Sequence, residues 1–213
     1  MDKWRYIIAI ITFIGFCILW LTYDTSVIEA FDKNASNLLY GLDFITLFHY
    51  LGETKVIFFI SLILLIFIGA RLKDLKLMLF VFLTVGLGYG LYQFLKHLIE
   101  RPRPEIPDQF STYSFPSGHA VHGLLYLLTI AYVVSKMVIS KKASQFIWGI
   151  AIILLLLIGT SRITEGRHYA SDVLAGWMLG YSWFILCVWW YETGNRKKVK
   201  NKNANASLCT TQA

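Results

Sequence analysis

The chain has 213 residues, of which 56% are hydrophobic and 15% are charged, and its mean hydropathy is +0.56. Because an ordinary soluble domain is about 25% charged, this composition excludes that class and indicates a membrane protein. The net charge of +7 comes from lysines and arginines dispersed between apolar segments, which argues against a nucleic-acid-binding surface.

Six apolar segments follow one another along the chain, at residues 6–23, 56–70, 77–95, 120–135, 143–161 and 173–191. A helix needs about 20 residues to cross the hydrocarbon core. The second and fourth segments are shorter, but Lys55 with Arg71 and His119 with Lys136 can extend them, because their polar ends reach the interface. The sequence therefore predicts an all-α integral membrane protein with six transmembrane helices in a bundle.

The ends and loops of the chain predict its organisation. The first segment is interpreted as an uncleaved helix, because Tyr23-Asp24-Thr25 is a poor signal-peptidase site. In residues 24–55, acids alternate with bulky apolar residues, which favours short interfacial helices in the first loop. Residues 1–191 are predicted to form one membrane domain, and the polar residues 192–213 a disordered tail.

Basic clusters predict the orientation in the membrane. They lie at residues 71–76, 136–142 and 196–202, and the positive-inside rule places these segments in the cytoplasm. Both termini are then cytoplasmic, and the loops at the opposite ends of the helices are extracytoplasmic. All four prolines lie in one of those loops, at 102, 104, 107 and 116, which predicts a stiff non-helical connector.

Three short segments on the extracytoplasmic side carry groups suited to phosphate chemistry. They are Lys96 with Arg103-Pro104, then Pro116-Ser117-Gly118-His119, then Ser161-Arg162 with His168 and Asp172. Lysine and arginine supply fixed positive charge, and guanidinium groups match phosphate oxygens two at a time. Ser117 and the N–H of Gly118 would lie at a helix N-terminus, which favours an anion.

Two histidines and one carboxylate could carry the proton and nucleophilic chemistry. His168 and Asp172 are four residues apart and would share a helix face. A carboxylate on one ring nitrogen fixes the imidazole tautomer and leaves the other nitrogen as a base or nucleophile. His119 is then a second proton-transfer group.

A metal site is the main alternative for these residues, with His119 and His122, or His168 and Asp172, as ligand pairs. Three permanent cations nearby would repel a divalent ion, and Asp172 is the only carboxylate inside the motifs. The sequence therefore predicts an anion site without a metal. The remaining histidines, His49, His97 and His122, are expected to have no catalytic role, and Arg101 and Arg167 to contact headgroups or solvent.

The patterns K-x6-R-P, P-S-G-H and S-R-x5-H-x3-D, in this order, resemble the three signatures of the type 2 phosphatidic acid phosphatase superfamily. All eleven defined positions are present: Lys96, Arg103, Pro104, Pro116, Ser117, Gly118, His119, Ser161, Arg162, His168 and Asp172. The resemblance covers residues 96–172. It implies that the helical bundle holds a catalytic core for hydrolysis of lipid phosphates.

The resemblance also implies a role for each motif residue. His168 would attack phosphorus and form a phosphohistidine, His119 would protonate the leaving group and then activate water, and Asp172 would orient His168. The phosphate would be held by the remaining polar motif groups, Lys96, Arg103, Ser117, Gly118 and Arg162. The resemblance implies no metal or organic cofactor. No nucleic-acid partner and no obligate protein partner are expected.

Substrates and alternatives follow from the same resemblance. The chain is similar in length to bacterial members that act on phosphatidylglycerophosphate or undecaprenyl diphosphate, in phospholipid metabolism and cell wall biogenesis. A soluble phosphate ester is a rival substrate. The alternative from another class is a lipid-binding or transport protein with an inactive site, although binding alone needs no positioned nucleophile.

Overall fold

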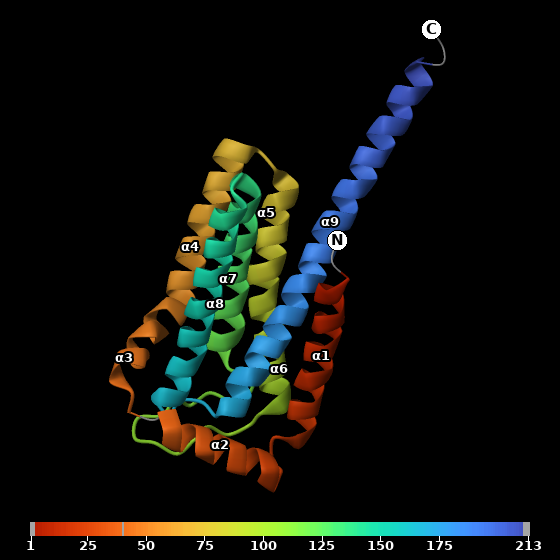
Figure 1. Cartoon of the computed structure of the whole chain (residues 1–213). Helices are drawn as coiled ribbons and strands as arrows, with labels where there is room; N and C mark the ends of the chain where they lie inside the picture. Colours follow the sequence, from red (N-terminus) through yellow and green to blue (C-terminus); the bar gives the residue numbers. More distant parts are fainter. Residues whose placement is uncertain (1–2, 40, 211–213) are drawn as a thin grey trace.

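The computed structural model describes the backbone of residues 3–39 and 41–210 and the side chains as far as residue 194, residue 40 excepted. All regular structure in these residues is helical, and six long helical segments form an elongated bundle (Figure 1). The basic cluster at 196–202 lies outside the described side chains, and residues 211–213 lie outside the described backbone.

The six predicted spans are confirmed as helices long and apolar enough to cross a membrane. Within the described residues they cover Trp4–Thr22, Thr54–Leu72, Leu75–Ile99, Gly118–Met137, Lys141–Thr164 and Ala170–Gly194. The second and fourth spans, with 19 and 20 residues, do include the charged or polar residues that were expected to lengthen them. The chain is therefore a multi-pass membrane protein.

Individual helices divide these spans further. The first span is α1 (Trp4–Thr22), and the second is α4 (Thr54–Phe67) with a π-helical end, η2 (Ile68–Leu72). In the third span a π-helical segment, η3 (Phe82–Leu87), joins α5 (Leu75–Val81) to α6 (Gly88–Ile99). The remaining spans are α7 (Gly118–Met137), α8 (Lys141–Thr164) and the first part of α9 (Ala170–Thr210).

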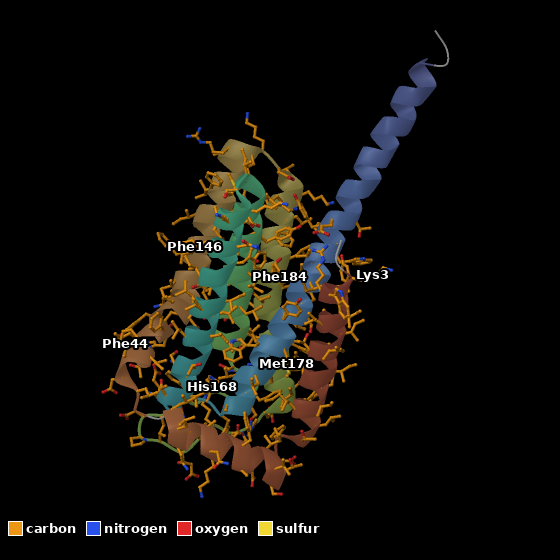
Figure 2. All side chains as sticks on the ribbon, viewed as in Figure 1. Lys3, Phe44, Phe146, His168, Met178 and Phe184 are labelled. Carbon is orange, nitrogen blue, oxygen red and sulfur yellow. The ribbon has the colours of Figure 1, made fainter. Side chains whose placement is uncertain are left out.

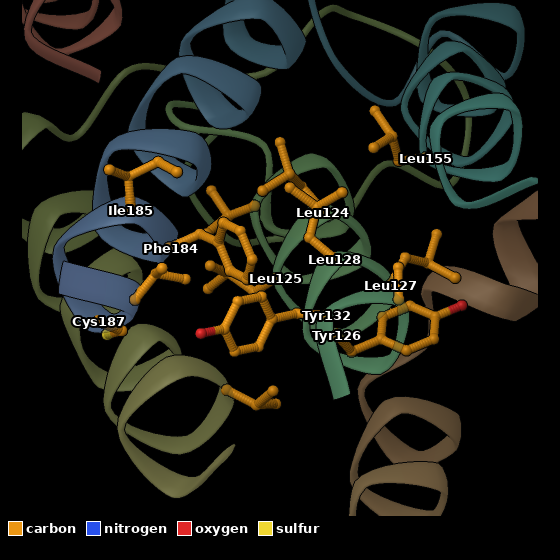
Figure 3. Packing of buried hydrophobic residues seen from close by; sticks show 14 of the residues in the cluster. Leu124, Leu125, Tyr126, Leu127, Leu128, Tyr132, Leu155, Phe184, Ile185 and Cys187 are labelled. Carbon is orange, nitrogen blue, oxygen red and sulfur yellow. The ribbon is translucent and has the colours of Figure 1, made fainter. Parts of the chain in front are cut away.

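Helix α7 is the centre of the bundle. It packs against α8 on one side and α9 on the other, while α1 lies along α9. Figure 3 shows Leu125 and Tyr132 of α7 close to Phe184 of α9. Because most of α7 is buried, the residues at its N-terminus are held in a fixed position by the packed core.

One end of the bundle is covered by the first loop. Its helices are α2 (Ser26–Leu39), α3 (Asp43–Thr46) and η1 (Leu47–Gly52), and α2 lies across the end of the bundle, opposite the end where α1 begins (Figure 1). Short helices are thus present where they were predicted. Their placement in the membrane interface stays a prediction.

The connector between α6 and α7 lies at the same end. Helix α6 ends at Ile99, its C-cap residue Glu100 has a left-handed φ of 53°, and residues 101–117 contain no helix. Helix α9 approaches the start of α7 closely at Gly176, where a Cβ atom would lie 2.9 Å from the Ser117 carbonyl oxygen. This glycine lets the two helices that carry Asp172 and His119 approach each other.

The domain boundaries stay a prediction. The backbone of α9 continues as a helix to Thr210, through most of the segment 192–213 that was predicted as a disordered tail. Residues 1–191 include all six spans except the last residues of the sixth.

Candidate active site

The three motif segments meet at one cavity of about 220 Å³, at the end of the bundle that α2 covers. Six of the eight predicted site residues line it: Lys96, Arg103, Gly118, His119, Arg162 and His168. His168 lies between the end of α8 and the start of α9 (Figure 2). Ser117 and Asp172 do not line the cavity, and both are fully buried. Ser117 precedes the lining residue Gly118, and Asp172 follows the lining residue His168 by four positions.

Three cations face this cavity: Lys96, Arg103 and Arg162. Arg103 is held by Thr112, Arg167 and His168, whereas the other two have few partners. Lys96 is 6% exposed, and its ammonium nitrogen lies 5.8 Å from the Tyr92 ring centroid and makes no hydrogen bond or ion pair with any group described. Arg162 donates from NH1 to Glu165 Oε2 at 2.7 Å, and its buried Nε has no partner among the described atoms. Buried donors of this kind favour binding of an anion with several oxygens.

His168 has a different partner on each ring nitrogen. Its Nδ1 lies 3.4 Å from Asp172 Oδ2 and 3.3 Å from Ser114 Oγ, and its Nε2 lies 3.1 Å from Arg103 NH1. An imidazole with its hydrogen on Nδ1 satisfies both sides, since Nδ1 then donates to Ser114 Oγ, which itself donates to Asp172, and Nε2 accepts from Arg103. Nε2, which faces the cations, is therefore the nitrogen with an available lone pair.

Burial and charge keep this imidazole neutral. Burial lowers the pKa of His168 well below its ordinary value, and the positive charges of Arg103, Lys96 and Arg162 lower it further. Burial also lowers the pKa of Arg103 to about 10, helped by the charge of Arg162. At neutral pH Arg103 is therefore still protonated, whereas His168 is a neutral base or nucleophile.

The first turn of α7 contributes the second histidine. His119 Nε2 is buried without a hydrogen-bond partner among the described atoms, and Glu53 Oε1 is 3.8 Å from it. The Ser117 hydroxyl at the N-cap is likewise buried and unpartnered within the described part of the chain. Together they place a proton-transfer group and additional donors at a helix N-terminus, which favours an anion.

Comparison with known proteins agrees with this geometry. The sequence profile of the PAP2 superfamily matches residues 77–196, which include every motif residue. The chain belongs to the PAP2 superfamily. The two curated relatives described next are named as phosphatases of lipid phosphates.

Among curated relatives, the chain is 32% identical over 187 residues to phosphatidylglycerophosphatase B of Bacillus subtilis, covering 82% of this chain and 90% of that protein. It is 31% identical over 146 residues to undecaprenyl-diphosphatase of Sulfolobus acidocaldarius, covering 66% of each.

Solved PAP2 structures share the fold. The crystal structure of a transmembrane PAP2-type phosphatidylglycerolphosphate phosphatase from Bacillus subtilis superposes with a TM-score of 0.80 at 27% identity, covering 87% of this chain and 96% of that one. Aquifex aeolicus LpxE superposes with a TM-score of 0.58 at 29% identity, covering 78% and 98%. The predicted family and fold class are therefore confirmed.

The expectation for Arg101 was wrong. It was expected to contact headgroups or solvent, but only 5% of it is exposed, and it pairs with Asp172 at 2.7 Å and Asp32 at 2.9 Å. A guanidinium this deeply buried needs counter-charges. Its two acids, Asp32 and Asp172, are far from Arg101 in the sequence, so the residues around Arg101 do not indicate them. Arg167, by contrast, is partly exposed, and its NH1 donates to the carbonyl oxygen of Asp108.

Sequence reasoning also missed three supporting groups. Ser114 donates a short hydrogen bond to Asp172, and Asp32 lies behind Arg101. Glu165 bridges two elements, because its carboxylate accepts from Arg162 and also lies 2.8 Å from His49 Nδ1. His122 is buried between Tyr89 and Tyr92 with its Nε2 unpartnered in the described structure, and it does not line the cavity.

Proposed function

We propose that this chain is a metal-independent lipid phosphatase that hydrolyses undecaprenyl diphosphate, phosphatidylglycerophosphate or both, through a phosphohistidine intermediate. The observation that carries the proposal is the cavity in which the neutral Nε2 of His168 meets three cations. The printed names of the two curated relatives support these two substrates.

In the first step, His168 Nε2 attacks phosphorus as the bond from phosphorus to the leaving oxygen breaks. Protonated His119 gives its proton to that oxygen, and Asp172 stabilises the charged imidazole. Lys96, Arg103, Ser117, the Gly118 amide and Arg162 hold the equatorial oxygens, where negative charge accumulates. Arg103 must move its NH1 donor from Nε2 to a phosphate oxygen for this attack to occur.

In the second step, His119 takes a proton from water, and the resulting hydroxide attacks phosphorus. The P–N bond breaks, inorganic phosphate forms, and His168 returns to its neutral state. Three permanent cations and one buried carboxylate disfavour a divalent metal here, so the charge stabilisation is assigned to the protein's own groups.

An apolar groove supports a lipid substrate over a soluble ester. It measures about 770 Å³, lies between α1, α6 and α9, and is lined almost entirely by apolar side chains. Leu91 and Leu95 of α6 belong to it, and the next residue after Leu95 is Lys96 of the cavity. Such a surface can take an acyl or prenyl chain while the phosphate reaches the cations.

The test is phosphate release by the purified protein from a panel of phosphatidylglycerophosphate, undecaprenyl diphosphate, phosphatidic acid and glycerol 3-phosphate. His168→Ala is expected to reduce turnover by about 10⁴-fold or more while the protein stays folded, because the nucleophile is lost. Wild-type turnover should persist in excess chelator.

Three outcomes would contradict the proposal. Normal turnover by His168→Ala would refute the assignment of His168 as the nucleophile. Strict dependence on added Mg²⁺ would indicate another mechanism. Absence of release from the whole panel would favour a lipid-binding or transport protein with an inactive site.

A further inference from the structure

The face that α2 turns toward the bundle carries one buried carboxylate. Ala35 and Leu39 of this face pack against an apolar cluster that includes Ile163 and Val173, and α2 contacts both α8 and α9. Asp32 lies on the same face, since positions 32, 35 and 39 follow the helical repeat, and it is 4% exposed. A carboxylate in such an interface is unfavourable unless it is fully paired.

Asp32 is fully paired, and its partners lead to the candidate active site. Its Oδ1 accepts from the Ser171 N–H at 2.7 Å. Its Oδ2 accepts from the Ser171 hydroxyl at 2.7 Å and from Arg101 NH2 at 2.9 Å. The first loop is thereby joined to the start of α9, one residue before Asp172.

Arg101 carries the connection to Asp172 itself. Its NH1 donates to Asp172 Oδ1 and to Ser171 Oγ, both at 2.7 Å. The guanidinium lies between the Tyr23 and Tyr169 rings, 5.0 and 4.1 Å from their centroids. Although burial opposes it, the carboxylates of Asp172 and Asp32 raise the pKa of Arg101, which is therefore a permanent cation between two acids.

The two carboxylate oxygens of Asp172 have different partners. Oδ1 accepts from Arg101, whereas Oδ2 accepts from the Tyr169 N–H at 2.9 Å and from the Ser114 hydroxyl, and lies 3.4 Å from His168 Nδ1. Without Arg101, both of the remaining hydrogen bonds to the carboxylate, from Tyr169 and Ser114, would be at Oδ2. The carboxylate could then turn about Oδ2 and change its position relative to the imidazole. A shift of about 1 Å in a catalytic group can cost about 10²-fold in rate.

We propose that Asp32 and Arg101 are positioning residues for catalysis: they fix the Asp172 carboxylate, and through it the imidazole of His168. The inference rests on the proposed function and adds to it a helix outside the three motifs. Neither residue lines the 220 Å³ cavity, although both line a second cavity of about 610 Å³ that also includes His168. Because Arg101 is paired with both carboxylates, the two residues are assigned to act through Asp172 and not on the phosphate.

Asp32→Asn and Arg101→Lys test this inference. Asn keeps the size of Asp32 but not its charge, and Lys keeps the charge of Arg101 but not the two-pronged geometry that reaches both carboxylates. We expect kcat to fall by about 10²-fold in each variant. KM and the inhibition constant of inorganic phosphate should change by less than about threefold, because the phosphate-binding groups are untouched.

Glu29→Gln is the matched control, because it neutralises an exposed acid one turn earlier on the same helix and should keep wild-type kcat. All variants are compared as monodisperse protein in detergent by thermal unfolding. If one of the two variants, Arg101→Lys or Asp32→Asn, cannot be purified in folded form, the kcat of the other variant alone tests the inference.

A double-mutant cycle then separates positioning from general loosening of the fold. In an Asp172→Asn background, Asp32→Asn should change kcat by less than about twofold, because the route through Asp172 is already broken. Wild-type kcat in both single variants, or fully multiplicative losses in the cycle, would overturn the inference. A wild-type protein that releases no phosphate would instead overturn the proposed function.

Discussion

His168 combines complete burial with three cationic neighbours, and this combination determines how its activity should depend on pH. Protonation of its imidazole is disfavoured, so the neutral nucleophile persists well below pH 6.5. Arg103 is the largest electrostatic contributor after burial. Removing its charge should therefore let the pKa of His168 rise toward its ordinary value.

We accordingly expect Arg103→Gln to move the acid limb of kcat/KM to higher pH, in addition to lowering its maximum. At pH 6 a larger share of His168 would be protonated in the variant than in the wild type, and only the neutral form attacks phosphorus. The measurement is a pH–rate profile from about pH 5 to 9, which reports the groups of the unbound enzyme.

Arg167→Gln provides the comparison, because this neighbouring arginine is partly exposed and is not among the groups that shift the pKa of His168. Its acid limb should coincide with that of the wild type. An unchanged acid limb in Arg103→Gln would show that the charge of Arg103 does not control the nucleophile.

Individual motif residues could be predicted from the sequence because their chemistry and spacing are local. Lys96 and Arg103 are seven positions apart, and His168 and Asp172 are one helical turn apart, so the sequence alone indicates that they act together. Asp32 and Arg101 are 69 positions apart, and Arg101 and Asp172 are 71 apart. Only the packed fold brings such residues together, and no local sequence pattern predicts that they pair.

At the scale of elements, η1 contacts the first turn of α7. A Cβ atom on Gly52 would lie 2.6 Å from His119 Cδ2 and 2.7 Å from Ile158 Cγ2, both closer than side chains tolerate. Gly52 therefore allows the first loop to lie directly against the second histidine.

Gly52→Ala should displace His119 and reduce kcat by about 10-fold or more, because proton transfer depends on the position of that ring. The measurement is steady-state phosphate release. Wild-type kcat in this variant would show that η1 can move without disturbing the histidine.

Gly90→Ala is the control substitution on α6, where an added Cβ meets no described atom within 4 Å. It should leave kcat unchanged. It should also raise the free energy of unfolding by about 1 kcal/mol, because alanine favours the helix over glycine. Thermal or denaturant unfolding in detergent measures this gain.

Apolar length predicted the six spans, and the polar residues at their ends predicted how far the short ones extend. The π-helical segments Ile68–Leu72 and Phe82–Leu87 were not predicted. They insert an extra residue into a helical turn, and whether a helix accepts this depends on its neighbours rather than on its own hydrophobic pattern.

At the scale of the whole molecule, the cavity lies at the end of the bundle that α2 covers. The first residues of α1 and the last part of α9 lie toward the opposite end (Figure 1). The sequence predicts that the termini are cytoplasmic, so the proposed site is extracytoplasmic. We expect an impermeant thiol reagent outside intact cells to label Asn34→Cys on α2 but not Lys142→Cys at the start of α8.

Both positions are exposed, and Cys17, Cys187 and Cys209 are first replaced by serine so that only the introduced thiol reacts. After cell lysis both variants should be labelled. Labelling of Lys142→Cys alone in intact cells would reverse the orientation.

The bond between Asp32 and Arg101 has a consequence for how such sequences are recognised. The superfamily profile matches only residues 77–196, and all eleven signature positions fall between 96 and 172. A truncated or recombined gene that starts at the second span would still score as a complete member. Its product would nevertheless carry an arginine with one of its two acids missing, so an intact signature does not guarantee a competent enzyme.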